Sequence, residues 1–350
     1  MAIKKVTIRD VAREAGVSVT LVSFVMNAKV GKDGRLDCPV NPKTAARVLE
    51  VAKRLGYRKN NAAASLRSGH SRTIALIVPD IANPFYSDIC RYLENIAYKA
   101  DYTVLFASSD ESWQKLGNLI DTVIGYNVEG LIVAPCTGCE PVLDKALSYN
   151  IPIILIDRNI SGDGYGRVMV NNEEAGRQAA KYLIDKGLKK IEMLTYSLGI
   201  TSLTEREKGY REAMREAGLE DNANVHPVDY DAESARNETV SIVQGALKRG
   251  VEAFFLPTKA LSMCALYAAR VLKRRIPDDL SFVCYDESDI FDIHDPVIPH
   301  IIQPLQGLAE ESFKMLRKMI EGEPVDKFVS LNSNLVLSGI VGSHRTPSSL

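Results

Sequence analysis

Charged side chains follow directly on apolar runs of the kind that form buried strands. Asp157 and Arg158 come after IPIILI, and Asp286 comes after LSFVCY. In open parallel sheets the binding crevice lies outside the carboxyl ends of the strands, so these side chains are candidates for gripping the hydroxyls or carboxylates of a small ligand. Each of them taken alone is also consistent with a salt bridge at a strand end.

No pattern in the sequence indicates catalysis or a metal. The five histidines show no metal-ligand spacing, and the glycine cluster GDGYG lacks the spacing of a dinucleotide fingerprint. The chain also has no phosphate-binding loop motif and no nucleophile elbow. We therefore expect no catalytic residue, no metal and no cofactor, which disfavours an α/β enzyme.

One Cys-x-x-Cys motif, Cys136 and Cys139, stands among the six cysteines. A zinc site normally needs a second pair of ligands, and a redox motif needs a thioredoxin-like context. Neither is evident, so we interpret the pair as two reduced thiols in a loop after a strand.

From residue 73 onward, strand-like and helix-like stretches alternate along the chain, and these elements position the side chains named above. Short apolar runs are separated by amphipathic stretches, which implies parallel sheets covered by helices on both faces. The length suggests two such sheets with a crevice between them. The runs are TIALIV, YTVLFA, GLIVA, IPIILID, IEMLT, AFFLP and LSFVCYD, and the helical stretches are 85–100, 112–125, 140–149, 173–187, 205–217, 233–249 and 259–274.

The charge of the chain is divided unevenly. Residues 1–72 carry 15 Lys and Arg against 5 Asp and Glu, whereas the remainder carries 28 against 39. A basic head on an acidic body indicates a polyanion-binding module joined to another domain. No apolar run reaches the length of a membrane span, and the N-terminus lacks a signal core, so we expect a cytoplasmic protein with no membrane partner.

The head reads as a helix-turn-helix. Thr7 and Asp10 form a start similar to a capping box, Gly16 permits a turn, and Ser18 can cap the next helix. Two short helices joined in this way place the second one in a DNA major groove. A third helix is expected across 41–56.

The stretch VTIRDVAREAGVSVTLVSFVMN, with VLEVAKRLGYRKNNAAASLRSG after it, resembles the lactose-repressor (LacI/GalR) family of transcription regulators. The resemblance implies an all-α helix-turn-helix head and an α/β body of two parallel-sheet lobes, similar to periplasmic binding proteins. It also implies a nucleoid-associated repressor that binds double-stranded operator DNA as a homodimer, under the control of a small-molecule effector. A sugar-binding protein of a transport system is the alternative, disfavoured by the basic head.

The family's pattern implies a set of DNA-contacting residues in the head and hinge. Val19 and Thr20 are short, so direct readout of bases looks modest. Phe24 stands where family members often have Arg, and its ring either packs on a thymine methyl group or folds onto the core of the head; we favour the core, because exposed Phe is costly. The whole set is Thr7, Ser18, Val19, Thr20, Ser23, Phe24, Asn27, Tyr57, Asn60, Ala63, Leu66 and Arg67.

Two further segments have open interpretations. The stretch 30–40 makes a longer connection than the family usually has, and its basic residues are candidates for phosphate contacts. The segment NNAAASLRSGHSR is either a flexible linker or, by resemblance, a helix that forms on the operator, where Leu66 wedges into the minor groove.

Effector residues follow from the same resemblance, which suggests a sugar or sugar phosphate. Lys259 departs from the family, which usually has Asn-Asp at 258–259; this lysine either favours a phosphorylated or acidic ligand or points outward. The positions implied are Phe85, Tyr86, Asp157, Arg158, Arg206, Thr258 and Asp286.

The expected domains are a DNA-binding head, a hinge and a two-lobed body. No leucine-heptad tail follows the body, so we expect a dimer rather than a tail-bundled tetramer. The boundaries are 1–60 for the head, 61–71 for the hinge and 72–345 for the body, with the N-lobe at about 72–161 and 291–322 and the C-lobe at about 162–290 and 323–345.

Overall fold

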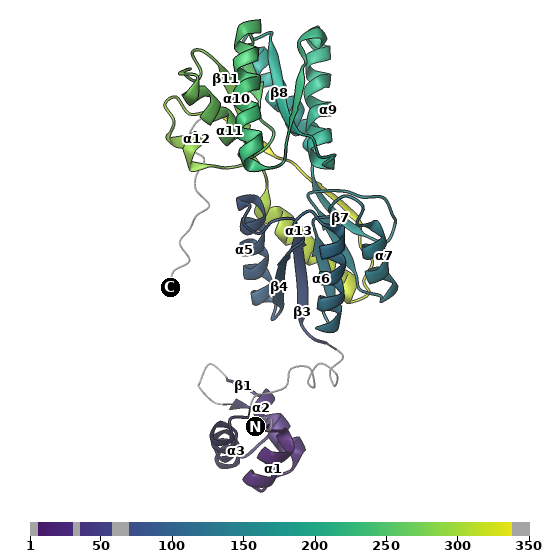
Figure 1. Cartoon of the computed structure of the whole chain (residues 1–350). Helices are drawn as coiled ribbons and strands as arrows, with labels where there is room; N and C mark the ends of the chain where they lie inside the picture. The colour runs from purple at the N-terminus through teal and green to yellow at the C-terminus, as the bar shows by residue number, and fades with distance from the viewer. Residues whose placement is uncertain (1–5, 31–35, 58–69, 338–350) are drawn as a thin grey trace. The chain divides into compact units, whose positions relative to one another are not determined.

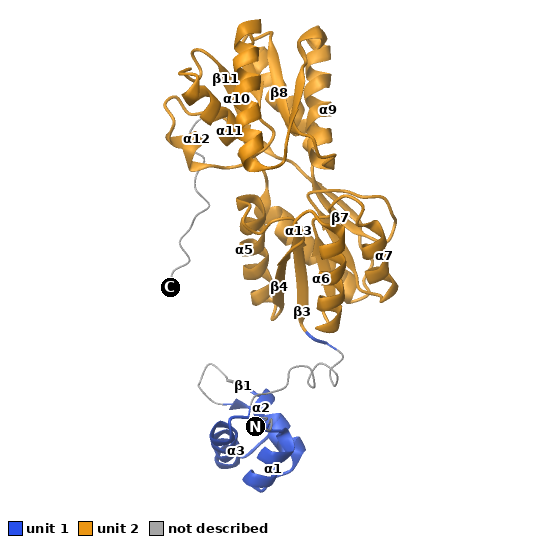
Figure 2. Cartoon of the chain, viewed as in Figure 1, with its two compact units in different colours: residues 1–71 blue, residues 72–350 orange. Residues whose placement is uncertain are grey.

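A computed structural model describes residues 6–30, 36–57 and 70–337 of the chain. The chain divides into two compact units, residues 1–71 and 72–350, which Figure 2 shows in different colours. Each unit has hydrophobic clusters of its own. In these described ranges no helix is long and apolar enough to cross a membrane.

Short helices with well-defined caps build the head. Its helices are α1 (Ile8–Ala15), α2 (Val19–Asn27) and α3 (Pro42–Leu55). The capping box between Thr7 and Asp10 is confirmed, and Gly16 ends α1 in the left-handed conformation at φ 63°. The hydroxyl of Ser18 accepts a bond from the Leu21 N–H at 3.2 Å and so starts α2.

The core of the head lies between the three helices. Val11, Val22 and Val48 are fully buried there. Leu49 is 39% exposed, because the buried face of α3 passes through Val48 and Val51. The head is also not wholly α-helical: β1 (Lys29–Val30) pairs antiparallel with β2 (Leu36–Asp37) at the two ends of the inserted connection.

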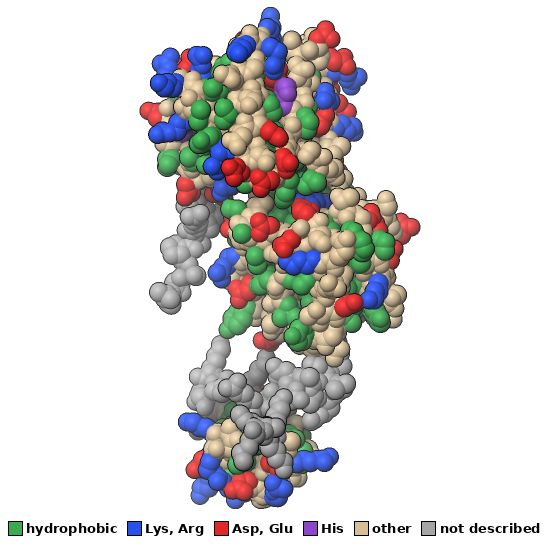
Figure 3. Space-filling model, viewed as in Figure 1, with side chains coloured by type: hydrophobic (Ala, Val, Ile, Leu, Met, Phe, Trp, Pro, Cys, Tyr) green, Lys and Arg blue, Asp and Glu red, His purple; other side chains and the backbone are tan. Residues whose placement is uncertain are grey.

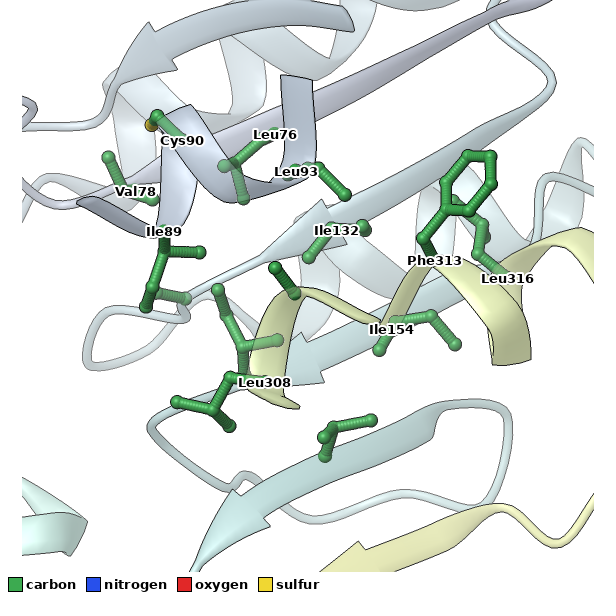
Figure 4. Packing of buried hydrophobic residues seen from close by; sticks show 14 of the residues in the cluster. Leu76, Val78, Ile89, Cys90, Leu93, Ile132, Ile154, Leu308, Phe313 and Leu316 are labelled. Atoms are coloured by element: carbon green, nitrogen blue, oxygen red, sulfur yellow. The ribbon is translucent and has the colours of Figure 1, made fainter. Parts of the chain in front are cut away.

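The first lobe of the body is a parallel sheet of order β13-β7-β6-β5-β3-β4 (Figure 1). Its strands are β3 (Thr73–Val78), β4 (Thr103–Ser108), β5 (Gly130–Val133), β6 (Ile153–Ile156), β7 (Gly166–Val170) and β13 (Phe328–Leu331), and its helices are α5 (Pro84–Lys99), α6 (Trp113–Gly125), α7 (Glu140–Ser148) and α13 (Leu305–Ile320). Successive strand residues face opposite sides, so Leu76 packs toward α5 and α13 and Ile77 toward α6 and α7. Figure 4 shows side chains of the first of these faces, among them Leu76, Ile132 and Ile154.

The second lobe repeats this plan with the order β14-β12-β11-β10-β8-β9, in which only β14 runs antiparallel to its neighbour. Phe282 faces α10 and α11, and Val283 faces α8 and α9. The strands are β8 (Ile191–Tyr196), β9 (Val225–Val228), β10 (Ala253–Phe255), β11 (Ser281–Tyr285), β12 (His300–Ile302) and β14 (Asn334–Val336). The helices are α8 (Asn172–Asp185), α9 (Thr201–Glu216), α10 (Ala232–Arg249), α11 (Lys259–Val271), α12 (Asp289–Ile293) and the 3-10 turn η1 (Glu220–Asn222).

The lobe boundaries expected from the sequence are wrong in three places. Strand β7 pairs with β6 and β13 pairs with β7, so both belong to the first lobe and not the second. Strand β12 pairs with β11 and belongs to the second lobe, although 291–322 was assigned to the first. These strands are short and lack a long apolar run, so the pairing partner and not the local sequence decides their sheet.

Candidate functional site

Helix α2 presents an exposed face without charged side chains. Val19 and Phe24 are 40% and 51% exposed, Thr20 and Asn27 are exposed as well, and Val22 is buried on the other side. Thr20, Phe24 and Asn27 follow one another at spacings of four and three residues, so they share one side of the helix. A helix of this kind offers a base edge a methyl-bearing, aromatic and amide surface.

The interpretation of Phe24 as a core residue is wrong. Val22 and Val25 occupy the inward positions of α2, and the helical period places residue 24 on the solvent side between them. The exposed ring is therefore available to the alternative contact, a thymine methyl group.

The other head residues have separate local roles. Ser23 is buried and accepts a bond from the side-chain amide of Asn27 at 3.2 Å, which orients that amide. The Thr7 hydroxyl donates to Asp10 at 2.7 Å within the cap, and Tyr57 packs against the core of the head. Asn60, Ala63, Leu66 and Arg67, and with them residues 31–35 of the insertion, lie outside the described residues.

In the first lobe, Asp157 stands directly after β6 in the left-handed conformation, at φ 62°. The hydroxyl of Tyr86 donates to its Oδ2 at 2.7 Å, and the Phe85 ring meets Tyr86 edge-on with centroids 4.9 Å apart. Burial and then the Asp157 charge raise the pKa of Tyr86 well above its ordinary value. The phenol therefore stays protonated and keeps donating to the carboxylate.

Arg158 is 8% exposed and is anchored within the same lobe. Its two terminal nitrogens each donate to the Glu111 carboxylate at 2.8 Å, and Nη1 also reaches the Pro135 carbonyl at 3.4 Å. Its buried Nε lies 3.5 Å from Asp157 and has no hydrogen-bond partner. Glu111 was not among the residues expected from the sequence, although it is an acid shortly after a strand, as Asp157 is.

In the second lobe, Arg206 is 3% exposed and fully oriented by its neighbours. Its Nε donates to the Asn172 side chain at 2.9 Å and its Nη1 donates to the Pro257 carbonyl at 2.6 Å. The guanidinium lies over the Tyr285 ring, 3.7 Å from the centroid. Asn172 and Tyr285 were also missed, because nothing local in the sequence ties either of them to Arg206.

Two glycines allow α9 to carry Arg206 at this position. A Cβ at Gly176 on α8 would overlap the carbonyl oxygen of Arg206, and a Cβ at Gly209 on α9 would overlap that of Glu173. The backbones of α8 and α9 thus touch, as only glycine permits. The placement of Arg206 therefore depends on residues that never face the crevice.

Asp286 is the counterpart of Asp157, directly after β11 and left-handed at φ 70°. Its Oδ1 accepts from the Gln303 amide at 2.6 Å and its Oδ2 accepts from the Lys259 backbone N–H at 3.2 Å. Burial raises the pKa of Asp286, Arg206 opposes that shift, and the negative charge of Asp157 adds to it. The charge of Asp157 in the first lobe therefore acts on Asp286 in the second.

The pair at 258–259 serves the second lobe itself. The Thr258 hydroxyl caps α11 by accepting from the Leu261 N–H at 3.1 Å. The Lys259 ammonium donates to the Glu287 carbonyl at 3.1 Å in an exposed setting, which favours the outward orientation among the two alternatives.

Polar atoms without partners remain next to Arg206 and Asp286. Among the described residues, the Tyr285 hydroxyl and the Gln303 carbonyl oxygen are buried without a hydrogen bond. Tyr230 of the second lobe lies edge-on to Tyr196, with centroids 5.0 Å apart, and its hydroxyl is 3.5 Å from Glu111 of the first lobe. Acidic side chains are prominent beside the lobe junction on the face seen in Figure 3.

A cavity of about 840 Å³ adjoins this region, bounded by the loops after β5 and β6 and by the start of α9. Of the expected effector residues it includes only Arg158; Cys136, Arg167 and Thr201 also line it. No cluster of three or more His, Cys, Asp or Glu suited to a metal occurs in the part of the chain that the structure describes. Carboxylate, guanidinium and aromatic groups are thus gathered at the strand ends of both lobes.

Known proteins match both parts of the chain. Residues 7–60 match the family of bacterial regulatory proteins named lacI, and residues 74–324 match the periplasmic binding protein domain. The chain is 28% identical over 326 residues to catabolite control protein A of Priestia megaterium, covering 93% of this chain and 95% of that protein. It is 29% identical over 323 residues to the ribose operon repressor of Halalkalibacterium halodurans, covering 92% of each.

A solved structure of the Lac repressor bound to ONPG has the same fold. It superposes with a TM-score of 0.79 over 95% of this chain and 98% of that one, at 22% identity. The expected fold, a helix-turn-helix head and a body of two largely parallel sheets, is confirmed. The chain joins a helix-turn-helix domain of the lacI family of bacterial regulatory proteins to a periplasmic binding protein domain, and it is a DNA-binding transcriptional regulator.

Proposed function

We propose that the body binds a neutral sugar between its lobes and that this binding controls the affinity of the head for operator DNA. The observation that carries the proposal is the pair of strand-end carboxylates, Asp157 and Asp286, one from each lobe and each held in place by its own lobe. Carboxylates accept bonds from sugar hydroxyls, and neighbouring aromatic rings cover a sugar face. A ligand hydroxyl would also relieve the unpartnered Tyr285 and Gln303, which are costly while buried alone.

The charges favour a neutral sugar over a sugar phosphate. Glu111 neutralises Arg158, and the Lys259 ammonium is bonded to a backbone carbonyl. Arg206 is then left as the positive charge opposite Asp157 and Asp286, so a phosphate dianion would meet net repulsion in a partly buried site. The name of the ribose operon repressor, a relative along almost the whole chain, supports a sugar ligand.

We infer that the head reads its operator mainly through α2 and the hinge. Ser18, Val19, Thr20 and Phe24 would lie in the major groove, and the apolar Leu66 would open a base step in the minor groove. Short and apolar side chains discriminate bases weakly, so deformation of the central base step would supply part of the specificity.

The homodimer needs an apolar surface on the body, and α11 offers one. Met263, Tyr267 and Val271 are 40%, 45% and 48% exposed and recur every four residues, which places them along one side of that helix. We propose that a second copy of the chain covers this stripe. We also propose that the protein catalyses no reaction. It would act in the cytoplasm, where the operators of the family lie.

The test is a thermal-shift screen of the full-length protein against ribose, other neutral sugars and their phosphates. A ligand that binds the folded state raises the melting temperature by mass action. We expect neutral sugars to shift wild type but not Asp157→Ala or Asp286→Ala, with the exposed Asp278→Ala as the matched control. A response confined to sugar phosphates would contradict the choice of ligand, and a response that both crevice variants retain would contradict the site.

A further inference from the structure

The Cys136 and Cys139 motif forms a closed turn at the start of a helix. The Cys139 N–H donates to the Cys136 carbonyl at 3.3 Å, and Gly138 between them is left-handed at φ 74°. Both cysteines are free, and their side chains share one hydrophobic cluster beneath β5 and α7. The turn therefore holds the two cysteines in one short loop, with both side chains in the same cluster.

The two thiols differ in their access to small molecules. Cys136 is 2% exposed and lines the cavity of about 840 Å³ described above, whereas Cys139 is completely buried and is absent from its lining. A reagent in the cavity would therefore meet Cys136 first.

The surroundings of the two thiols also make them differ in how readily they ionise. Cys139 is the N-cap of α7, and its side chain caps no backbone N–H. The interaction between the two thiols lowers the pKa of Cys136 and raises that of Cys139, while burial and the Glu111 charge oppose the lowering at Cys136. Cys136 is thus the more readily ionised member.

We propose that Cys136 and Cys139 are a reversible redox pair that reacts with low-molecular-weight disulfides entering the cavity, with Cys136 as the attacking thiol and Cys139 as the resolving thiol. The Cys136 thiolate attacks one sulfur of R–S–S–R, forms a mixed disulfide and releases RS⁻, which takes up the proton that Cys136 lost. Cys139 then gives up its proton and attacks the Cys136 sulfur, releasing the second RSH. Two protein thiols are oxidised and one small disulfide is reduced.

The pair also has a built-in reporter and a connection to the crevice. Trp113, the one tryptophan of the chain, packs against the turn: a Cβ at Gly138 would lie 3.9 Å from its ring. The Pro135 carbonyl, directly before Cys136, accepts the bond from Arg158. A disulfide in this turn therefore forms beside both Trp113 and an arginine of the proposed effector site, and its detection does not depend on identifying the effector.

The experiment exposes full-length protein to glutathione disulfide and then alkylates the remaining thiols after unfolding. We expect wild type to lose two alkylation sites, mapped to Cys136 and Cys139, with a change in Trp113 fluorescence that dithiothreitol reverses. Cys139→Ser is expected to stop at a glutathione adduct on Cys136, and Cys136→Ser to form neither adduct nor internal disulfide. Cys264→Ser, a substitution of another buried thiol, is the control and should react as wild type does.

Several results would overturn the proposal. One is wild type in which both motif cysteines remain fully alkylated after the treatment. Another is a glutathione adduct on Cys139 in place of Cys136. The mapping of oxidised thiols on wild type decides the main claim even if a serine variant fails to fold. If a disulfide is mapped but the Trp113 fluorescence does not change, the packing of the turn against that ring is contradicted.

Discussion

Proteins usually bury apolar side chains and expose charged ones. The exposed face of α2 departs from this rule by exposing an apolar ring, and the crevice of the body departs from it by burying charges. On α2 a large apolar ring, Phe24, is half exposed in a helix that carries no charge. In the crevice, Arg206 and Arg158 are more than nine-tenths buried, and the hydroxyl of Tyr285 is buried without a partner. Apolar groups normally lie inside and charges outside, so both regions forgo stability in the unliganded protein.

The difference between the two regions lies in how each is supported. The exposed face of α2 needs only the helix behind it, because Val22 and its neighbours form an ordinary core. The buried polar groups need specific partners from distant segments, such as Asn172 for Arg206 and Glu111 for Arg158. Substitutions on the exposed face of α2 should therefore leave the rest of the head unchanged. Substitutions at the crevice should lower both ligand affinity and the stability of the body.

The largest expected effect follows from removing the buried guanidinium. Arg206→Ala should weaken binding of the sugar found in the screen by about 2–5 kcal/mol, because a buried charged partner is lost and Asn172 loses its donor. Calorimetry on this variant and on Arg215→Ala, an exposed arginine of the same helix, measures the difference. Equal affinities in the two variants would place the ligand away from the crevice.

The support of the crevice is expected to be nearly as sensitive. Gly176→Ala should destabilise the body by roughly 3 kcal/mol, because the added methyl group overlaps the backbone of α9 at Arg206 and pushes that helix away. Gly125→Ala, where no atom lies within 4 Å of the added methyl, should be nearly neutral. Urea unfolding of both variants measures this contrast, and similar midpoints would show that α8 and α9 can separate without cost.

Sequence reasoning succeeded where the signal was local. The caps at Thr7 and Ser18 and the long apolar strands are readable from a few adjacent residues, and the structure confirms them. It failed where the outcome depends on distant contacts: the sheet to which β7, β12 and β13 belong, and the partners Glu111 and Asn172. For Phe24 the cost of exposing an aromatic ring was weighted above the helical period, and the period decided the outcome.

A smaller effect distinguishes the two faces of α2. Val22→Ala should destabilise the head by about 2 kcal/mol, because it removes buried methyl groups, whereas Phe24→Ala should change its stability by less than about 1 kcal/mol. Hydrogen exchange of the α2 and α3 amides measures this local stability. For operator affinity the order of the two variants should reverse, with Phe24→Ala causing the larger loss. Phe24→Ala should also weaken binding to the operator more than binding to non-specific DNA. A large stability loss in Phe24→Ala would mean that the ring packs inward in solution.

The smallest effect is a dependence on pH. Burial raises the pKa of Asp286, so the folded protein binds a proton more tightly there than the unfolded chain does. The contribution of Asp286 to protein stability is therefore highest below the ordinary pKa of an aspartate, and it falls as the pH rises through the raised value.

Asp286→Asn does not titrate, so the stability of wild type relative to this variant should decrease from acidic to neutral pH. The exposed Asp278→Asn should give no matching trend. Melting temperatures of the three proteins from pH 4 upward measure the slope. A wild-type advantage that grows toward neutral pH would mean that Arg206 and Gln303 stabilise the carboxylate more than burial opposes it, and that the crevice is prepared for a cationic rather than a neutral ligand.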